Sequence, residues 1–263
     1  MKNKILSHLP GDFPWQVHWY HSIDSTNTRA KVLARDGAPH GTVLIAGQQT
    51  AGRGRMGRSF TSPSGLGLYF SLILRPACRA EELMHLTCAA GIAACHAVEE
   101  VTGYRPGIKW INDLVANNKK LGGILTELSV DAGTGLVNYA IIGIGINCNH
   151  TADDFPAELQ DIALSLRTVT GKSVDIAALA AALIQQLKSM DSLLLTDRGA
   201  IMETYRKNCV TLGRQVKVIG QETREATALN IDDEGGLIVR YSDGSIATVS
   251  SGEVSVRGLF GYQ

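Results

Sequence analysis

Residues 43–74 read VLIAGQQTAGRGRMGRSFTSPSGLGLYFSLIL and contain two strand-like runs on either side of a loop rich in glycine and arginine. The runs at 43–47 and 66–74 are short, apolar and rich in β-branched or aromatic residues, which is typical of buried strands. The segment 48–65 between them has the glycine, serine and proline content of a loop. Because long loops inside compact domains are usually functional, the stretch predicts two core strands joined by a functional loop.

The loop formally matches the dinucleotide-binding pattern GxGxxG through Gly52, Gly54 and Gly57. A turn of that kind must open directly into a helix whose N-terminus holds the pyrophosphate. Here the chain continues through SFTSPSG (59–65) into a strand, so a dinucleotide site is excluded. The sequence contains no GxxxxGK[ST] phosphate-binding loop either.

Three arginines remain in the loop, Arg53, Arg55 and Arg58. Their guanidinium forks, together with backbone N–H groups, could close over a phosphate or a carboxylate. A solvated basic loop without a function explains the same composition, since short charged motifs are weak signals. The loop composition alone leaves both interpretations open.

Helices are predicted before and after this stretch. The helix predicted within 22–37 begins with capping residues, among them Thr26 as a helix cap. The helix predicted within 80–102 ends before Gly103. In the second helix and in a later one that starts at Asp175, apolar residues recur at helical spacing. The predicted helices lie within 22–37, 80–102, the residues that follow Asp175, and 197–208.

Three further stretches are strand-like: 107–111, 122–130 and 136–148. Asn117 and Asn118 are suited to a tight turn, so we expect the first two of these strands to form a hairpin through them. Strands and helices together predict an α+β fold built on a mixed β-sheet flanked by helices.

After Gly213 the pattern changes to short strands separated by glycine, aspartate and asparagine turns. This pattern predicts a small β-barrel of its own. We therefore expect two domains, at 1–210 and 211–263.

The composition is that of an ordinary globular protein, with 44% hydrophobic and 19% charged residues among 263. The 25 lysines and arginines balance the 25 aspartates and glutamates, which excludes a global positive field for nucleic acid or membranes. No apolar run is long enough for a signal sequence or a membrane span, so a cytoplasmic protein is expected. The five cysteines lack a CxxC pair and are interpreted as small buried hydrophobes rather than disulfides or zinc ligands.

Two other segments carry candidate chemistry. KWIND (109–113) and KKLGG (119–123) could place lysines, an amide and a carboxylate on adjacent strands, where they would hold an anion and a metal. Taken singly, each of these residues is typical of a surface charge. GIGIN (143–147) alternates glycines along a strand, which indicates either close approach by a ligand or tight packing against the helix within 80–102.

The order of the motifs resembles the catalytic domain of biotin protein ligases. The motifs are DSTN (24–27), QTAGRGRMGR (49–58), KWIND (109–113), KKLGGILTE (119–127) and IGIGIN (142–147). The ending GEVSVR (252–257) is similar to that family's C-terminal domain. Two positions depart from the family: Ile111 stands where proline is usual, and Phe60 where tryptophan is common.

The resemblance implies a fold like that of class II aminoacyl-tRNA synthetases, with a small SH3-like β-barrel at the C-terminus. It also implies an ATP- and Mg²⁺-dependent ligase that forms biotinyl-AMP from biotin and ATP and releases pyrophosphate. The biotin is then transferred to a specific lysine of a biotin carboxyl carrier protein, part of a carboxylase such as acetyl-CoA carboxylase.

The resemblance also assigns roles to individual residues. The implied catalytic residues are Lys120, Arg53, Arg55 and Asp113, with Asp113 also a ligand of Mg²⁺. The implied biotin-binding residues are Ser25, Thr26, Asn27, Gln49, Gly52, Arg53, Lys120 and Gly123. The implied ATP-binding residues are Arg55, Arg58, Asn112, Asn147 and Arg257.

Three alternatives accompany this hypothesis. A lipoate or octanoate ligase or transferase of the same fold would act on a carrier lysine in a similar way. A module that binds biotin or RNA without catalysis would bind a ligand but consume no ATP. A DNA-binding repressor is not expected, because only about twenty residues precede Asp24, fewer than a DNA-binding domain needs. A homodimer through the sheets is common in the family and compatible with the sequence.

Overall fold

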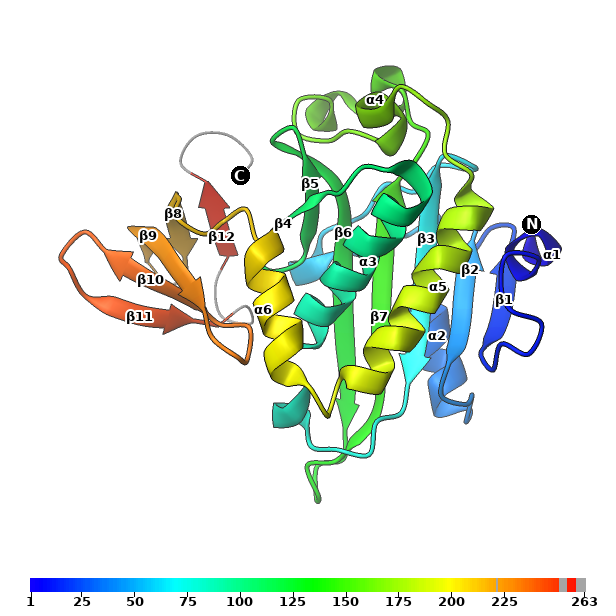
Figure 1. Ribbon diagram of the computed structural model, residues 1–263, viewed down its shortest axis with the longest axis horizontal. Helices are drawn as coiled ribbons and strands as arrows, with labels where there is room; N and C mark the ends of the chain where they lie inside the picture. Colours follow the sequence, from blue (N-terminus) through cyan, green and yellow to red (C-terminus); the bar gives the residue numbers. More distant parts are fainter. Residues whose placement is uncertain (221, 251–254, 259–263) are drawn as a thin grey trace.

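The centre of the molecule is a seven-stranded mixed sheet (Figure 1). The computed structural model describes residues 1–220 and 222–250, and it describes 255–258 as backbone. In spatial order the strands are β1 (Gln16–Tyr20), β2 (Thr42–Ala46), β3 (Gly67–Leu74), β7 (Val137–Asn147), β6 (Lys119–Val130), β5 (Asp113–Ala116) and β4 (Gly107–Lys109). β1 and β2 pair in parallel, and every other neighbouring pair is antiparallel.

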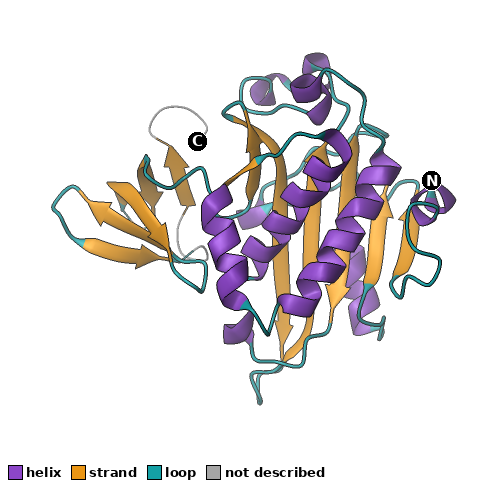
Figure 2. Ribbon diagram, viewed as in Figure 1, coloured by secondary structure: helices purple, strands orange, loops and turns teal. Residues whose placement is uncertain are grey.

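Helices cover both faces of this sheet, as Figure 2 shows in purple. α3 (Leu86–Thr102) and α5 (Ile176–Leu193) pack against each other over one face, with α6 (Arg198–Asn208) beside α3. α2 (Thr26–Arg35) packs on the opposite face against β3 and β7. The short helices are α1 (Lys2–Leu6), α4 (Leu166–Thr170), and the 3₁₀ turns η1 (Arg55–Gly57), η2 (Ala80–Leu83), η3 (Ala152–Asp154) and η4 (Ala157–Leu159).

The two faces of the sheet bury different sets of side chains. Along β3, Phe70 and Leu72 belong to the main core between the sheet and α3 and α5. Ile73 belongs to a smaller cluster with Ala30 and Ala34 of α2. This alternation follows the two-residue period of a strand. Because the α2 cluster is small, much of its face of the sheet is available to the arginine-rich loop.

The predicted helix boundaries are confirmed at several positions. Asp175 caps α5 by accepting hydrogen bonds from the backbone N–H groups of Ala177 and Ala178, at 2.9 and 3.4 Å. Gly103 ends α3 in the left-handed conformation, with φ 72°. The predicted cap of α2 was wrong by one residue, because Ser25 is the N-cap and Thr26 is the first helical residue.

The asparagine turn is confirmed, but its strands differ from the prediction. Asn117 and Asn118 have φ of 47° and 61°, as a tight turn with two left-handed residues requires. They join β6 to β5, a four-residue strand that the sequence analysis did not separate from its neighbours. β4, which contains much of the predicted 107–111 strand, pairs with the other side of β5.

The C-terminal part forms a separate antiparallel sheet, which confirms the small β domain. Its order is β11 (Ile246–Val249), β10 (Leu237–Tyr241), β9 (Thr223–Ile231), β8 (Gln215–Ile219) and β12 (Ser255–Gly258). Trp110 links it to the large sheet: its backbone N–H donates to Thr211 Oγ1 at 2.9 Å and its indole N–H to the Gly235 carbonyl at 2.8 Å. The boundary between 210 and 211 stays a prediction.

All five cysteines are free thiols in buried positions, which confirms the interpretation drawn from their spacing. Within the described part of the chain, none of the helices combines the length and apolar character needed to cross a bilayer.

Candidate functional site

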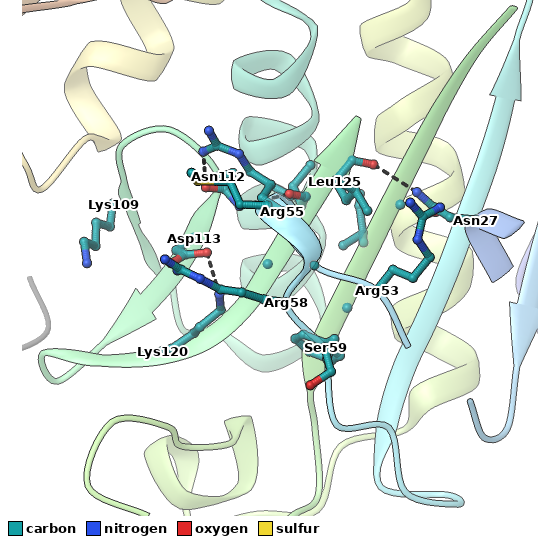
Figure 3. Close-up of a pocket in the computed structure, with 18 of the residues that line it drawn as sticks. Asn27, Arg53, Arg55, Arg58, Ser59, Lys109, Asn112, Asp113, Lys120 and Leu125 are labelled. Atoms are coloured by element: carbon teal, nitrogen blue, oxygen red, sulfur yellow. Dashed lines mark hydrogen bonds and ion pairs between the residues drawn. The ribbon is translucent and has the colours of Figure 1, made fainter. Parts of the chain in front are cut away.

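A cavity of about 750 Å³ lies on the face of the large sheet that carries α2, a size typical of small-molecule sites (Figure 3). Its floor includes Gly143 and Gly145 of β7 and Gly123 of β6. The N-terminus of α2, the arginine-rich loop and the β4–β5 connection form its walls.

The glycines of β7 are required by close neighbours on this face. A Cβ added at Gly143 would lie 2.1 Å from Asn27 Oδ1, and one at Gly145 would lie 2.6 Å from the ring of Phe60. Both distances are shorter than packed atoms allow. The alternating glycines therefore admit the α2 terminus and the loop against the sheet, and they leave a cavity between these parts.

The arginine-rich loop folds into a hairpin, although much of it is exposed. The Phe60 N–H donates to the Gly52 carbonyl at 2.9 Å, and the Gly54 N–H donates to the Arg58 carbonyl at 2.7 Å. Met56 occupies the tip in a left-handed conformation, with φ 54° and ψ 39°. The backbone of 52–60 thus directs the three arginines over the cavity.

Two of the loop arginines are anchored to different parts of the sheet, one to strand β6 and the other to the β4–β5 connection. Arg53 makes a forked ion pair with Glu127 of β6, Nη1 to Oε2 at 3.4 Å and Nη2 to Oε1 at 3.3 Å. Arg55 donates from Nη1 to Asn112 Oδ1 at 2.9 Å. Figure 3 shows Arg53 beside Asn27 at one end of the cavity, with Arg55 at the other.

The end that contains Arg55 is strongly charged. Lys120 Nζ donates to Asp113 Oδ1 at 2.7 Å, and the two side chains are 30% and 16% exposed. Arg58 reaches toward this pair in Figure 3. Burial lowers the pKa of Arg55, an effect opposed by the negative charge of Asp113. Arg55, Arg58 and Lys120 therefore meet the carboxylate of Asp113 where an anion could be held, and Lys109 also lines the cavity.

Lys120 is held through its backbone as well as its side chain. Its N–H donates to the Ile162 carbonyl at 2.7 Å, and its carbonyl accepts from the Leu164 N–H at 2.9 Å. Asn147 secures the same segment, because its buried amide donates to the Leu164 carbonyl at 3.1 Å. The segment around 162–164 thus fixes the start of β6 beside the cavity.

The opposite end of the cavity is polar. Gln49 Oε1 accepts from the Thr26 N–H at 2.8 Å and from its hydroxyl at 3.0 Å, while Gln49 Nε2 donates to Ser62 Oγ at 2.9 Å. Ser25 caps α2 by accepting from the Thr28 N–H at 3.4 Å. These contacts give the amide of Gln49 a fixed orientation at the cavity wall.

Asn27 connects this polar end to the sheet. It is 4% exposed, accepts from Ser71 Oγ at 2.6 Å and donates to Glu127 Oε2 at 3.0 Å. Glu127 also accepts from Lys31 of α2. Sequence reasoning did not single out Glu127. The period of β6 places Gly123, Leu125 and Glu127 on one face, which could have indicated it.

Most of the residues named by the resemblance meet in the cavity. Those that line it are Ser25, Thr26, Asn27, Gln49, Arg53, Arg55, Arg58, Asn112, Asp113, Lys120 and Gly123. Gly52 and Asn147 are not among the lining residues: Gly52 belongs to the hairpin backbone, and Asn147 bonds to the Leu164 carbonyl. Arg257 lies on β12, and its side chain is outside the described part of the structure.

The two departures from the family pattern are both accommodated. Ile111 is 4% exposed, its carbonyl accepts from the Tyr205 hydroxyl at 3.1 Å, and the Trp110–Ile111 peptide bond is cis. Phe60 lines the cavity and meets Tyr69 edge to face, with ring centroids 6.5 Å apart. Neither residue prevents Asn112 from reaching Arg55.

A mixed sheet flanked by helices, with a cavity that is cationic at one end and polar at the other, is typical of an enzyme that could bring anionic groups and a compact polar group together. Comparisons with known proteins agree. The family model described as the biotin/lipoate A/B protein ligase family matches residues 19–147, and that of the biotin protein ligase C-terminal domain matches 211–257.

Relatives and solved structures extend these matches over most of the chain. The bifunctional ligase/repressor BirA of Bacillus subtilis is 38% identical over 230 residues, 86% of this chain and 70% of that protein. The biotin–[acetyl-CoA-carboxylase] ligase of Mycobacterium tuberculosis is 30% identical over 88% of this chain and 85% of that protein. The biotin protein ligase of Aquifex aeolicus, solved with biotin and ATP, has a TM-score of 0.79 and 31% identity, covering 94% of this chain and all of that one. The chain belongs to the biotin protein ligase family.

Proposed function

We propose that this protein joins biotin to ATP as biotinyl-AMP and then transfers the biotin to a lysine of a biotin carboxyl carrier protein. The observation that carries the proposal is the division of one cavity into two ends. The cationic end, with Arg55, Arg58 and Lys120, suits two anions, and the polar end, with Thr26 and Gln49, suits a compact neutral ring.

The first step brings the biotin carboxylate to the α-phosphorus of ATP. A carboxylate oxygen forms the new bond to phosphorus while the bond to the pyrophosphate oxygen breaks. Both reactants are anionic, so their approach requires fixed positive charge. Arg55, Arg58 and Lys120 supply it, and Asn112 is placed to orient the nucleotide. Arg53, which the resemblance implied as a catalytic and biotin-binding residue, is paired with Glu127 in this structure.

The ureido ring of biotin carries hydrogen-bond donors and acceptors on a neutral rim. Such a ring needs a few fixed polar partners in an otherwise apolar pocket. Ser25, Thr26 and Gln49 supply neutral polar groups at the end beside α2, and Gly123 leaves room for the ring and its acyl chain. We therefore propose that biotin lies with its ring near α2 and its carboxylate near Lys120.

Mg²⁺ usually binds proteins through one or two carboxylates and completes its shell with substrate phosphates and water. Asp113 offers one carboxylate at the cationic end, and no cluster of three or more acidic, histidine or cysteine ligands occurs among the described residues. This donor set fits an ion that arrives with the nucleotide, and Asp113 would hold it. The ion would supply charge stabilisation on the phosphates.

In the second step the amine of the acceptor lysine attacks the acyl carbonyl of biotinyl-AMP, AMP leaves, and the amine loses a proton. Lys120 and Asp113 stand at this end of the cavity. The loop hairpin covers the mixed anhydride, which water would otherwise hydrolyse. The carboxylase named in the Mycobacterium relative supports a carrier protein of that class as the acceptor.

Biotin-dependent exchange of labelled pyrophosphate into ATP tests the first step directly. Wild-type protein with Mg²⁺ is expected to support exchange with biotin and not with lipoate. Exchange with lipoate alone would move the protein to the lipoate branch of the superfamily, although the match to the biotin protein ligase C-terminal domain favours biotin. Binding of biotin without any exchange would indicate a non-catalytic module.

Two predictions about partners remain. The equal numbers of cationic and anionic residues, 25 each, support a protein that does not bind DNA. A homodimer through the sheets stays a prediction, and light scattering at several protein concentrations with and without biotin would test it.

A further inference from the structure

Glu127 carries three interactions although it is not among the cavity-lining residues. Its carboxylate accepts from Asn27 and Lys31 of α2 and from both terminal nitrogens of Arg53. Its side chain is 19% exposed, compared with 42% for Arg53. One half-buried carboxylate therefore joins the β6 strand, the α2 helix and the arginine-rich loop.

We propose that Glu127 is a positioning residue that holds the first limb of the loop through Arg53, and so completes the biotin end of the cavity. The kinetic test of this inference rests on the proposed function, because it measures the KM for biotin. In this arrangement the charge of Arg53 is paired with Glu127, whereas Arg55, Arg58 and Lys120 stand at the end proposed for the carboxylate and phosphates.

The backbone shows why Arg53 is the effective anchoring point. Arg53 forms an isolated bridge with Ser59, the last pair before the loop tip. Below it, the Thr50 and Ala51 N–H groups donate to the carbonyls of Ile23 and Asp24, at 2.9 and 2.8 Å. The base of the loop is thus held by backbone bonds to the segment before α2. Above the base, the side chains of Arg53 and Arg55 tie the hairpin to Glu127 and Asn112, and Arg53 is the anchor nearer to α2.

The position of this anchor predicts which substrate it affects. Arg53 lies beside Asn27, and Asn27 follows the Thr26 that bonds to Gln49 at the proposed biotin end. The other anchor, Arg55 to Asn112, stands at the nucleotide end. Loss of the Arg53–Glu127 pair should therefore weaken biotin binding while the apparent affinity for ATP is retained.

Three variants test the proposal. Glu127→Gln keeps an oxygen that accepts from Asn27 and removes the charge, and Arg53→Gln removes the other partner. Lys31→Met is the matched control, because it takes one cation from Glu127 but leaves the pair with Arg53 in place. Lys31 does not line the cavity.

We expect Glu127→Gln and Arg53→Gln each to raise the KM for biotin by about two- to fivefold, the size of one partly exposed ion pair. In Glu127→Gln, whose altered residue does not line the cavity, the KM for ATP should stay near its wild-type value. The KM for biotin of the double variant should not exceed that of the more impaired single variant, since both changes remove the same ion pair. The proposal would be overturned if the double variant multiplied the increases in the KM for biotin of the two single variants. It would also be overturned if the KM for ATP rose as much as the KM for biotin.

Hydrogen exchange in residues 51–60, measured by mass spectrometry, provides a test that requires no activity. Exchange should be faster in Glu127→Gln and Arg53→Gln than in wild type, and unchanged in Lys31→Met. Unchanged exchange in both Gln variants would overturn the proposal. If Glu127→Gln fails to fold, Arg53→Gln carries the test alone, because it leaves Glu127 paired with Lys31 and Asn27. Absence of pyrophosphate exchange in wild type would count against the proposed function only.

Discussion

Lys120 stands at the centre of the cationic end, where its ammonium group lies 2.7 Å from Asp113 Oδ1. A cation fixed in this way stabilises charge that develops on the α-phosphate, and removing one such group typically costs about 10²-fold or more in rate. We therefore expect Lys120→Ala to reduce kcat for pyrophosphate exchange by at least about 10²-fold, with little change in thermal stability. Lys172→Ala, at an exposed lysine that does not line the cavity, is the control. An exchange rate in Lys120→Ala equal to that of the control would contradict the assignment.

Gly143 is predicted to tolerate no side chain. Its added Cβ would approach Asn27 Oδ1 to 2.1 Å, and Asn27 cannot withdraw without losing its bonds to Ser71 and Glu127. We expect Gly143→Ala to lower the free energy of unfolding by about 1–3 kcal/mol, as overpacking does. Urea unfolding measures this change. Gly199→Ala, in α6 with nothing within 4 Å of the added atom, should instead be neutral or stabilising by up to about 1 kcal/mol.

Glu127 should also make stability depend on pH. Burial acts to raise the pKa of Glu127, but hydrogen bonds from Lys31 and Asn27 and the charges of Lys31 and Arg53 outweigh it, so its pKa is lowered. The stabilisation is therefore fully present above the unfolded pKa of about 4.3 and is lost as the pH falls through the folded pKa. We expect the difference in unfolding free energy between wild type and Glu127→Gln to shrink as the pH is lowered from neutrality to below that range. A difference that does not change with pH would show that the charge of Glu127 does not stabilise the fold.

At the level of elements, two helix caps differ in their position relative to the cavity. Ser25 caps α2 and lines the cavity, whereas Asp175 caps α5 on the other face of the sheet. Replacing either by alanine should lower the free energy of unfolding by about 0.5–2 kcal/mol. Only Ser25→Ala should also raise the KM for biotin, which steady-state kinetics on the two variants would measure. An equal rise in both variants would mean that the cap affects biotin binding through global stability alone.

Helix positions followed from local signals that the sequence displays directly. Asp175 and Gly103 have the start and stop chemistry of helices, and both occupy the expected ends of α5 and α3. The turn at Asn117 and Asn118 was also visible, because asparagine tolerates positive φ and two of them between strand-like runs are typical of a tight turn. The separate strand Asp113–Ala116 was not, since four residues are too few for periodicity to resolve.

The candidate site depended on both motif resemblance and long-range packing. Lys120 and Asp113 are close in sequence, on strands of one hairpin, so their pairing could be expected from local order. Glu127 and Arg53 are 74 residues apart, and only the sheet order brings them together. Asn147 was predicted as a nucleotide contact, but in the structure its amide donates a hydrogen bond to the Leu164 carbonyl.

At the scale of the whole molecule, the C-terminal sheet supports one wall of the cavity. Trp110 lines the cavity, and its indole N–H donates to the Gly235 carbonyl of the small sheet. Arg206 of α6 makes a second link, because its Nε donates to the Ile231 carbonyl at 2.7 Å. The buried apolar core is continuous from α3 to Leu237 of β10. The two sheets should therefore unfold together.

This continuity leads to a test of the whole chain. Urea unfolding followed by tryptophan fluorescence and by far-ultraviolet circular dichroism should give one coincident transition in wild type. Trp110→Phe keeps the aromatic packing but leaves the buried Gly235 carbonyl without its indole donor, which costs about 1–3 kcal/mol. The variant should unfold at lower urea concentration and bind substrates less tightly, because a cavity wall loses its support. Two separate transitions in the wild-type protein would show instead that the small sheet is an independent unit and that Trp110 joins two domains without coupling their stability.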